Sequence, residues 1–317
     1  MIAKISIGTD SQAKGSASPA KGSASPAKGS ASPAKGSASP AKGFAAEVSG
    51  IDLKQDLNQT TLRWIEDELQ RFGVLVFRKQ GLSEAEQIRI AEAFGPLDGG
   101  LRKATGAPSR FSHEALIDIG NVALDGEVSA KNDARLLSRL ANQLWHSDSS
   151  FQNIPVAYSM LSAVVVPEHG GDTEWCDLRS AYEQLSDDLR QIVEGLVAVH
   201  SAFHSRRLLG DDQYTADQLA KFPPVRRPLV YQHPFDGRKI VHPSVHIESI
   251  DGMTVPEARL LVAELLEHVT QPAFVYRHRW QAGDYVMWDN RSTLHRGRRY
   301  DLRDRRDLRR TTTVERH

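Results

Sequence analysis

The chain has 317 residues, 40% of them hydrophobic, which is enough for one large core or two small ones. Lys and Arg together number 40, as do Asp and Glu, and this balance argues against nucleic acid or an anionic membrane as the main partner. The single cysteine cannot form an internal disulfide, and no stretch approaches the roughly 20 apolar residues that cross a bilayer. Because the N-terminus also lacks a secretory signal, we expect a cytoplasmic protein with a small-molecule partner, no nucleic acid and no membrane. A homo-oligomer is left open.

A seven-residue repeat, AKGSASP, occupies Ala13 to Gly43. Each unit carries a Pro and a Gly and offers only Ala as an apolar side chain, so neither a coiled coil nor a long helix is expected. We predict a flexible N-terminus over residues 1–43 and a folded domain over residues 44–317. An alternative is that the repeat loops out between a first strand, IAKISI, and the domain, since the cost of loop closure grows only logarithmically with length.

The first part of the domain predicts a helix, a buried strand and a second helix. TTLRWIEDELQRF (60–72) has apolar residues at helical spacing, and GVLVF (73–77) is typical of a short buried strand. Ser83 and Glu86 form a capping box for a helix that Gly95 and Pro96 end.

The second part is rich in predicted strands, in VAYSMLSAVVV (156–166), GGDTEWCDL (170–178), PAFVYRHRW (272–280), DYVMWD (284–289) and RRTTTVE (309–315). Two helices interrupt them, YEQLSDDLRQIVEGL (182–196) and EARLLVAELLEHV (257–269), the latter capped by Thr254 with Pro256 in its first turn. The pattern favours a mostly β fold with flanking helices, built on a double-stranded β-helix (jelly-roll) core.

The stretch QLWHSDSSFQ (143–152) places His146 and Asp148 two positions apart. In an extended segment, residues i and i+2 project from the same face, so the imidazole and the carboxylate would lie side by side. A chain with 12 histidines can contain such a pair by chance, and two polar residues in a surface loop are the alternative at this point.

A third candidate ligand, His295, follows the strand-like DYVMWDN. Closure of a jelly roll would bring it to the first two. Two histidines and one carboxylate on one face of an octahedral metal leave three positions open, as in non-haem Fe(II) oxygenases. A closed zinc site more often uses cysteine or four protein ligands.

Such an iron centre needs a co-substrate, and 2-oxoglutarate fills two open positions while its far carboxylate needs a cation. Arginine suits that role because its planar fork donates two hydrogen bonds. Arg306 and Arg310 lie four residues apart, on one face of a strand. The alternative is that the eight arginines between Arg296 and Arg310 form a solvated or phosphate-binding surface, although interspersed aspartates argue against it.

From Phe44 to about Glu315 the chain resembles the taurine-dioxygenase-like family of Fe(II)- and 2-oxoglutarate-dependent dioxygenases, and within it the branch that degrades aryloxyalkanoates of the 2,4-dichlorophenoxyacetate type. The resemblance implies a jelly-roll core and a metal triad of His146, Asp148 and His295. It is carried by VLVFR, FGPLDGG, NQLWHSDSSFQ, YSMLSAVVVPEHGGDTEWCD, FVYRHRW and VMWDNRSTLHRGRRYD.

Further roles follow from the same resemblance. Thr173, after the Gly-Gly-Asp turn, and Arg306, eleven residues past the distal histidine, match the pair that holds the far carboxylate of 2-oxoglutarate. Arg310 matches the arginine that meets the acid group of the substrate. Four more residues are implied near the substrate: Lys103, Ser149, His233 and His246. A solvated lysine and packed or surface histidines are the alternatives for three of these.

The resemblance implies Fe(II) as cofactor and 2-oxoglutarate and O2 as co-substrates. The reaction would give succinate and CO2 and would hydroxylate the carbon beside an ether oxygen, so that the product collapses to a phenol and glyoxylate. The protein would aim the C–H bond. Two alternatives are a dioxygenase of the same family that acts on an alkylsulfonate or another small acid, and a non-enzymatic metal-binding jelly roll that senses a small acid.

Overall fold

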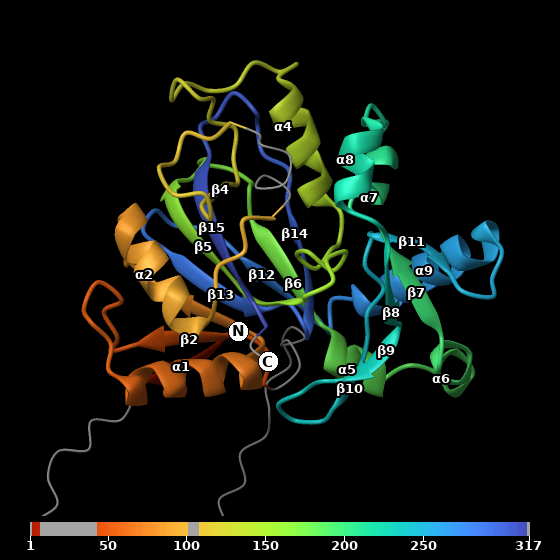
Figure 1. Ribbon diagram of the computed structural model, residues 1–317. Coiled ribbons are helices and arrows are strands. Elements are labelled where there is room, and N and C mark those ends of the chain that lie inside the picture. The colour runs from red at the N-terminus through yellow and green to blue at the C-terminus, as the bar shows by residue number, and fades with distance from the viewer. Residues whose placement is uncertain (1, 7–42, 101–107, 316–317) are drawn as a thin grey trace, which may run out of the picture.

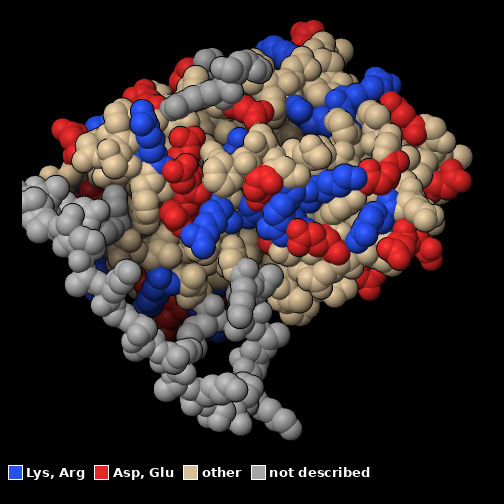
Figure 2. All heavy atoms as spheres, turned by 90° about the horizontal axis from the view of Figure 1, so that it is seen from below, with Lys and Arg blue, Asp and Glu red and all other residues tan. Residues whose placement is uncertain are grey.

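The structure is a computed structural model, which describes residues 2–6, 43–100 and 108–315 (Figure 1). The repeats between Ala13 and Lys42, and with them their predicted flexibility, lie outside the described residues, as does Lys103. No helix of the described part is long and apolar enough to span a membrane. Acidic and basic side chains are interspersed over the face seen in Figure 2.

A seven-stranded sheet forms the centre of the molecule, in the order β1 (Ala3–Ser6), β2 (Ala46–Ser49), β3 (Val74–Phe77), β13 (Tyr285–Asp289), β5 (Val156–Val165), β15 (Asp307–Val314) and β4 (Ile117–Asp118). The edge strand β1 pairs in parallel with β2, with Ala3 opposite Ala46. The sheet therefore includes residues N-terminal to the domain boundary expected at Phe44.

Two helices, α1 (Gln59–Phe72) and α2 (Glu84–Phe94), cover one face of this sheet (Figure 1). The predicted capping box of α2 is confirmed, since the hydroxyl of Ser83 accepts a hydrogen bond from the backbone N–H of Glu86 and the Glu86 carboxylate accepts one from that of Ser83. Gly73 ends α1 in the left-handed conformation, with φ of 71°.

The opposite face packs against a three-stranded sheet of β12 (Val275–His278), β6 (Thr173–Asp177) and β14 (Thr293–Gly297). Successive residues of β13 alternate between the two sides, so Met287 packs under the helices and Trp288 packs toward β6. The rings of Trp288 and Trp175 meet edge to face, with centroids 5.5 Å apart. The predicted mostly β architecture with flanking helices is confirmed.

A lateral layer contains two small sheets, β7 (Val197–His200) with β8 (Val225–Pro228) and β11 (Ile247–Ile250), and β9 (Val230–Gln232) with β10 (Lys239–Val241). Its helices are α5 (Leu178–Glu183), α6 (Asp187–Val193), α7 (His204–Arg207), α8 (Ala216–Lys221) and α9 (Val255–Val269). Helix α4 (Ala134–Arg139) lies at the top of the molecule, above the end of β14 (Figure 1).

The single helix predicted over residues 182–196 is wrong. Helix α5 ends at Glu183, and α6 begins after Ser186, whose hydroxyl accepts a hydrogen bond from the backbone N–H of Leu189 at 3.2 Å. A serine side chain that satisfies a free N–H favours a helix start over helix continuation.

Burial of His242 in the lateral layer can be tested through the pH dependence of stability. Burial, together with the nearby charge of Arg227, lowers its pKa to about 4. Between that pH and about 6.5 the unfolded chain binds a proton that the folded chain does not, so stability falls as the pH falls through this window. The free energy of unfolding, measured in urea from pH 7 to pH 4, should fall less steeply for His242→Gln than for the wild type. The difference should be about 1.4 kcal/mol per pH unit, which corresponds to the uptake of one proton on unfolding.

The exposed His169 supplies the control for this measurement, because its side chain is 89% accessible. His169→Gln should follow the wild type throughout. Parallel curves for wild type and His242→Gln would contradict the assignment of a buried neutral imidazole.

Candidate metal centre and adjoining cavities

Backbone hydrogen bonds pair His146 directly with His295. Each donates its N–H to the carbonyl of the other, at 3.0 and 2.8 Å, and their ring centroids lie 4.2 Å apart. His295 lies within β14, whereas His146 forms an isolated bridge followed by a turn that contains Asp148, in place of the extended segment assumed from the sequence.

The three predicted ligands converge. Nε2 of His295 is 3.7 Å from Oδ2 of Asp148, Nε2 of His146 is 4.0 Å from Oδ1, and the candidate ligand atoms all lie within 4.8 Å of one another. All three residues are buried. Among the described residues, this is the group of His, Cys, Asp and Glu whose spacing could hold a metal ion.

The protonation states suit a divalent metal. The Nδ1–H of His146 donates to the carbonyl of Leu144 at 2.7 Å, which leaves the lone pair on Nε2 directed at the other two side chains. Burial lowers the pKa of both His146 and His295, so both imidazoles are neutral at neutral pH. Burial alone would raise the pKa of Asp148, but Arg310 and the two histidines lower it overall, so the carboxylate is ionised.

A narrow cavity of about 60 Å³ opens on one side of the triad. Thr173 and Arg306 line it together with His146, His295 and Arg310. It contains both arginines of the predicted pair, although β15 begins only at Asp307.

Arg306 is a buried cation, with 5% of its surface exposed. It donates to the carbonyls of Ile119 and Gly171 at 2.8 and 3.2 Å, while its Nε is buried and has no partner among the described residues. Gly171 makes this approach possible: its φ is 70°, and a Cβ there would lie 3.2 Å from that Nε. A buried guanidinium that forms no ion pair within the described chain is suited to bind a carboxylate from the cavity.

Thr173 faces the same cavity from β6. Its hydroxyl oxygen accepts a hydrogen bond from Nε1 of Trp280 at 2.9 Å, so the hydroxyl hydrogen is available for an acceptor in the cavity. Thr173 and Arg306 therefore offer a neutral and a charged donor to one anion.

A larger cavity of about 440 Å³ lies on the other side and shares His146 and Arg310 with the first. Ser149, Phe151 and His246 line it, and the rings of the latter two meet edge to face with centroids 4.9 Å apart. The guanidinium of Arg310 forms an ion pair with the carboxylate of Asp148. Ser149 adopts a left-handed conformation, with φ of 50°.

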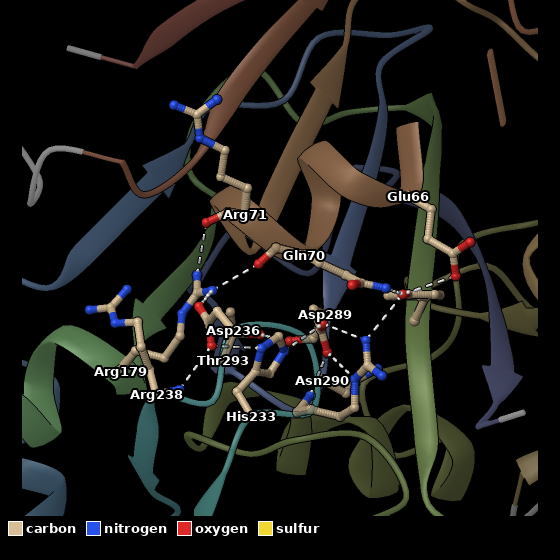
Figure 3. Close-up of polar contacts among 12 residues, drawn as sticks. Glu66, Gln70, Arg71, Arg179, His233, Asp236, Arg238, Asp289, Asn290 and Thr293 are labelled. Atoms are coloured by element: carbon tan, nitrogen blue, oxygen red, sulfur yellow. Dashed lines mark hydrogen bonds and ion pairs between the residues drawn. The ribbon is translucent and has the colours of Figure 1, made fainter. Parts of the chain in front are cut away.

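His233 is not brought to either cavity. It is fully buried between two carboxylates, with Nε2 3.1 Å from Oδ2 of Asp289 and Nδ1 3.2 Å from Oδ1 of Asp236 (Figure 3). Because both ring nitrogens are engaged there, the expected contact with a substrate is corrected to a place in this polar cluster.

Several cavity residues were not found from the sequence. Asn142 and Arg139 line both cavities, and Arg206 lines the larger one. Asn142 lies inside the motif NQLWHSD and could have been found there. The two arginines come from α4 and α7, short helices with no chemical motif.

Residues 35–312 match the family described as "Taurine catabolism dioxygenase TauD, TfdA family". The chain belongs to this TauD, TfdA family. It is 54% identical over 268 residues to the "Alpha-ketoglutarate-dependent 2,4-dichlorophenoxyacetate dioxygenase" of Cupriavidus pinatubonensis. The aligned region covers 84% of this chain and 93% of that protein. It is 35% identical over 251 residues to the "(S)-phenoxypropionate/alpha-ketoglutarate-dioxygenase" of Sphingobium herbicidovorans, with coverage of 77% and 80%.

Among solved structures, this TauD, TfdA family member is similar to AAD-2, crystallised in complex with Mn(II) and N-oxalylglycine. The TM-score is 0.83 and the identity 42%, over 87% of this chain and 96% of that chain.

The triad generates a direct test by metal binding. Titration of Mn(II) into the purified protein, followed by calorimetry, should show about one tight site per chain. Replacement of any one ligand should weaken Mn(II) binding by more than about 100-fold, in His146→Ala, Asp148→Ala and His295→Ala alike. Loss of a residue that only hydrogen-bonds to a metal ligand costs up to about 100-fold, and loss of the ligand itself should cost more.

His246→Ala is the matched control, because His246 is also buried and its ring centroid is 6.0 Å from that of His146, yet it lies outside the triad. Its affinity for Mn(II) should stay near that of the wild type. Unchanged affinity in any triad variant would remove that residue from the ligand set.

Proposed function

We propose that this protein is an Fe(II)- and 2-oxoglutarate-dependent dioxygenase that hydroxylates an aryloxyalkanoate, of the 2,4-dichlorophenoxyacetate type, on the carbon next to the ether oxygen. The products are a phenol, glyoxylate, succinate and CO2. One observation carries the proposal: two cavities meet at His146, and one contains Arg306 while Arg310 reaches both. Each of two small acids can then have its own cation beside one metal. The activities named for the relatives of the chain agree with this.

The donor set fits Fe(II). Two neutral imidazoles and one carboxylate, held on one side by the β-bridge, form the ligand set of non-haem iron oxygenases and leave positions open. Bound Fe(II), with 2-oxoglutarate and O2, supplies the oxidising power that breaks the C–H bond. The named complex of AAD-2 with Mn(II) and N-oxalylglycine, an amide analogue of 2-oxoglutarate, supports this pairing of metal and co-substrate.

Thr173 and Arg306 bind the far carboxylate of 2-oxoglutarate in the narrow cavity. The buried guanidinium gains a counter-ion and the threonine hydroxyl gains an acceptor, so both donors are satisfied when the co-substrate is bound. This orientation directs the keto acid end of 2-oxoglutarate toward the triad.

The larger cavity binds the organic substrate. Arg310 holds its carboxylate, with Ser149 as a nearby contact through its backbone, and His246 lines the wall beside Phe151. Aromatic side chains, including Phe203 and Tyr214 whose ring centroids are 4.4 Å apart, provide an apolar surface for the aryl group. Lys103 remains a proposed contact outside the described residues.

The two facing sheets support a further proposal about the fold. Strands β6 and β14 lie across the core from β13 and β5, and the metal ligands come from one end of this pair of sheets. We infer a double-stranded β-helix core within a dioxygenase domain that consists of residues 44–317 and the edge strand β1, and that contains every proposed site residue.

Product analysis tests the activity. Protein supplied with Fe(II), ascorbate and 2-oxoglutarate should release succinate and phenol in equal amounts with phenoxyacetate and 2,4-dichlorophenoxyacetate. Succinate release with an alkylsulfonate and none with aryloxyacetates would favour the other small-acid activity. Failure to bind 2-oxoglutarate in the presence of a divalent metal would favour the non-enzymatic sensor.

The two arginines should separate the two acids kinetically. Arg306→Gln should raise KM for 2-oxoglutarate, and Arg310→Gln should raise KM for the aryloxyacetate, each by at least about 30-fold, since loss of one partner from a buried charge pair costs about 2 kcal/mol or more. Steady-state kinetics with each acid varied in turn provide the measurement. Equal effects of both variants on both KM values would contradict separate binding sites.

A further inference from the structure

Asp148 is held from behind by a buried chain of hydrogen bonds that lies outside both cavities. Its Oδ2 accepts from the hydroxyl of Ser159 at 2.7 Å, and that hydroxyl accepts from Nδ2 of Asn290 at 2.8 Å. The backbone N–H of Asp148 donates to Oδ1 of Asn290 at 3.2 Å. Ser159 and Asn290 are 0% and 2% exposed, so water does not compete with these contacts.

The direction of each hydrogen bond is determined by its neighbours. Oδ1 of Asn290 faces two N–H donors, the backbone of Asp148 and Nε1 of Trp288 at 3.1 Å, and this fixes which end of the amide is oxygen. The NH2 group must then face Ser159. An amide NH2 cannot accept and an ionised carboxylate cannot donate, so the hydroxyl hydrogen of Ser159 is directed to the carboxylate of Asp148, and the hydroxyl of Thr312, 3.1 Å from that of Ser159, is left to donate to it.

Asn290 itself is fixed by the polar cluster of Figure 3. The preceding residue, Asp289, is fully buried, contacts His233, and accepts from the guanidinium of Arg291 at 2.7 Å. The backbone N–H of Asn290 donates to the carbonyl of Ala157 at 2.9 Å. The amide is therefore attached to a rigid strand end that is independent of any ligand.

We propose that Ser159 and Asn290 are positioning residues that set the rotation of the Asp148 carboxylate for metal binding. One carboxylate oxygen is engaged by Ser159, and the backbone of Asp148 is held by Asn290. The carboxylate is thereby prevented from turning away from the two histidines or from binding the metal through both oxygens, which would occupy an additional coordination position. This inference rests on the proposed metal site.

Mn(II) binding to the full-length protein, measured by calorimetry, tests the proposal. Ser159→Ala and Asn290→Ala should each weaken binding by about 10- to 100-fold, the usual effect of removing a hydrogen-bond partner of a ligand. Ser159→Thr retains the hydroxyl and should bind more tightly than Ser159→Ala. The electron paramagnetic resonance spectrum of bound Mn(II) should change in the alanine variants, because it reports ligand geometry.

Ser162→Ala is the matched control, since Ser162 lies on the same strand, β5, and is 2% exposed. It should leave both affinity and spectrum unchanged. Circular dichroism and thermal melting establish that each variant is folded, and the Ser159 variants alone decide the result if Asn290→Ala does not fold.

The outcomes distinguish this inference from the proposed function. A wild type that binds no Mn(II) would overturn the proposed metal site itself. A wild type that binds Mn(II), together with Ser159→Ala that matches Ser162→Ala, would overturn only the positioning role. The double variant should lose less than the sum of the single losses, because both residues act on one carboxylate.

Discussion

Two backbone hydrogen bonds between His146 and His295 are the constraint on which the site depends. They join segments that are about 150 residues apart in the chain, so their cost in chain entropy must be offset by the packing of the whole sheet system. Trp175 and Trp288 supply part of that packing directly behind β14, where the Trp288 ring centroid is 4.8 Å from that of His295. The ring of His295 therefore packs on fully buried residues of the core.

The two arginines beside the triad differ in their electrostatic partners. Asp148 lines the larger cavity, and Arg310, which lines both cavities, is ion-paired with it. The guanidinium of Arg306, by contrast, donates to backbone carbonyls and lies 5.5 Å from the ring centroid of Tyr300, with no ion pair to a carboxylate among the described residues. A buried charge without a counter-ion is costly, and a bound carboxylate removes that cost. The pair of arginines thus accounts for a preference for acids on both sides, while the balanced net charge of the chain shows nothing of this local field.

The polar cluster around Asp289 holds the end of β13 next to the metal site. Burial would raise the pKa of this carboxyl, but Arg291 and His233 lower it overall, so a charged pair holds the end of β13 in place. The next residue, Asn290, accepts a hydrogen bond from the backbone N–H of Asp148 and donates one to Ser159, whose hydroxyl donates to the Asp148 carboxylate. His233 therefore contacts this end of β13 without lining either cavity.

The sequence by itself determined the local elements and the identity of the reactive residues. Capping at Ser83 and Thr254 depends on neighbours in the chain, so it could be predicted, and the motif around His146 with its distant partner indicated the metal triad. The break after Glu183, the placement of His233 and the roles of Ser159 and Asn290 could not be predicted. Tertiary structure alone decided these, because a hydrogen bond between strands depends on register and burial, which no short stretch of sequence specifies.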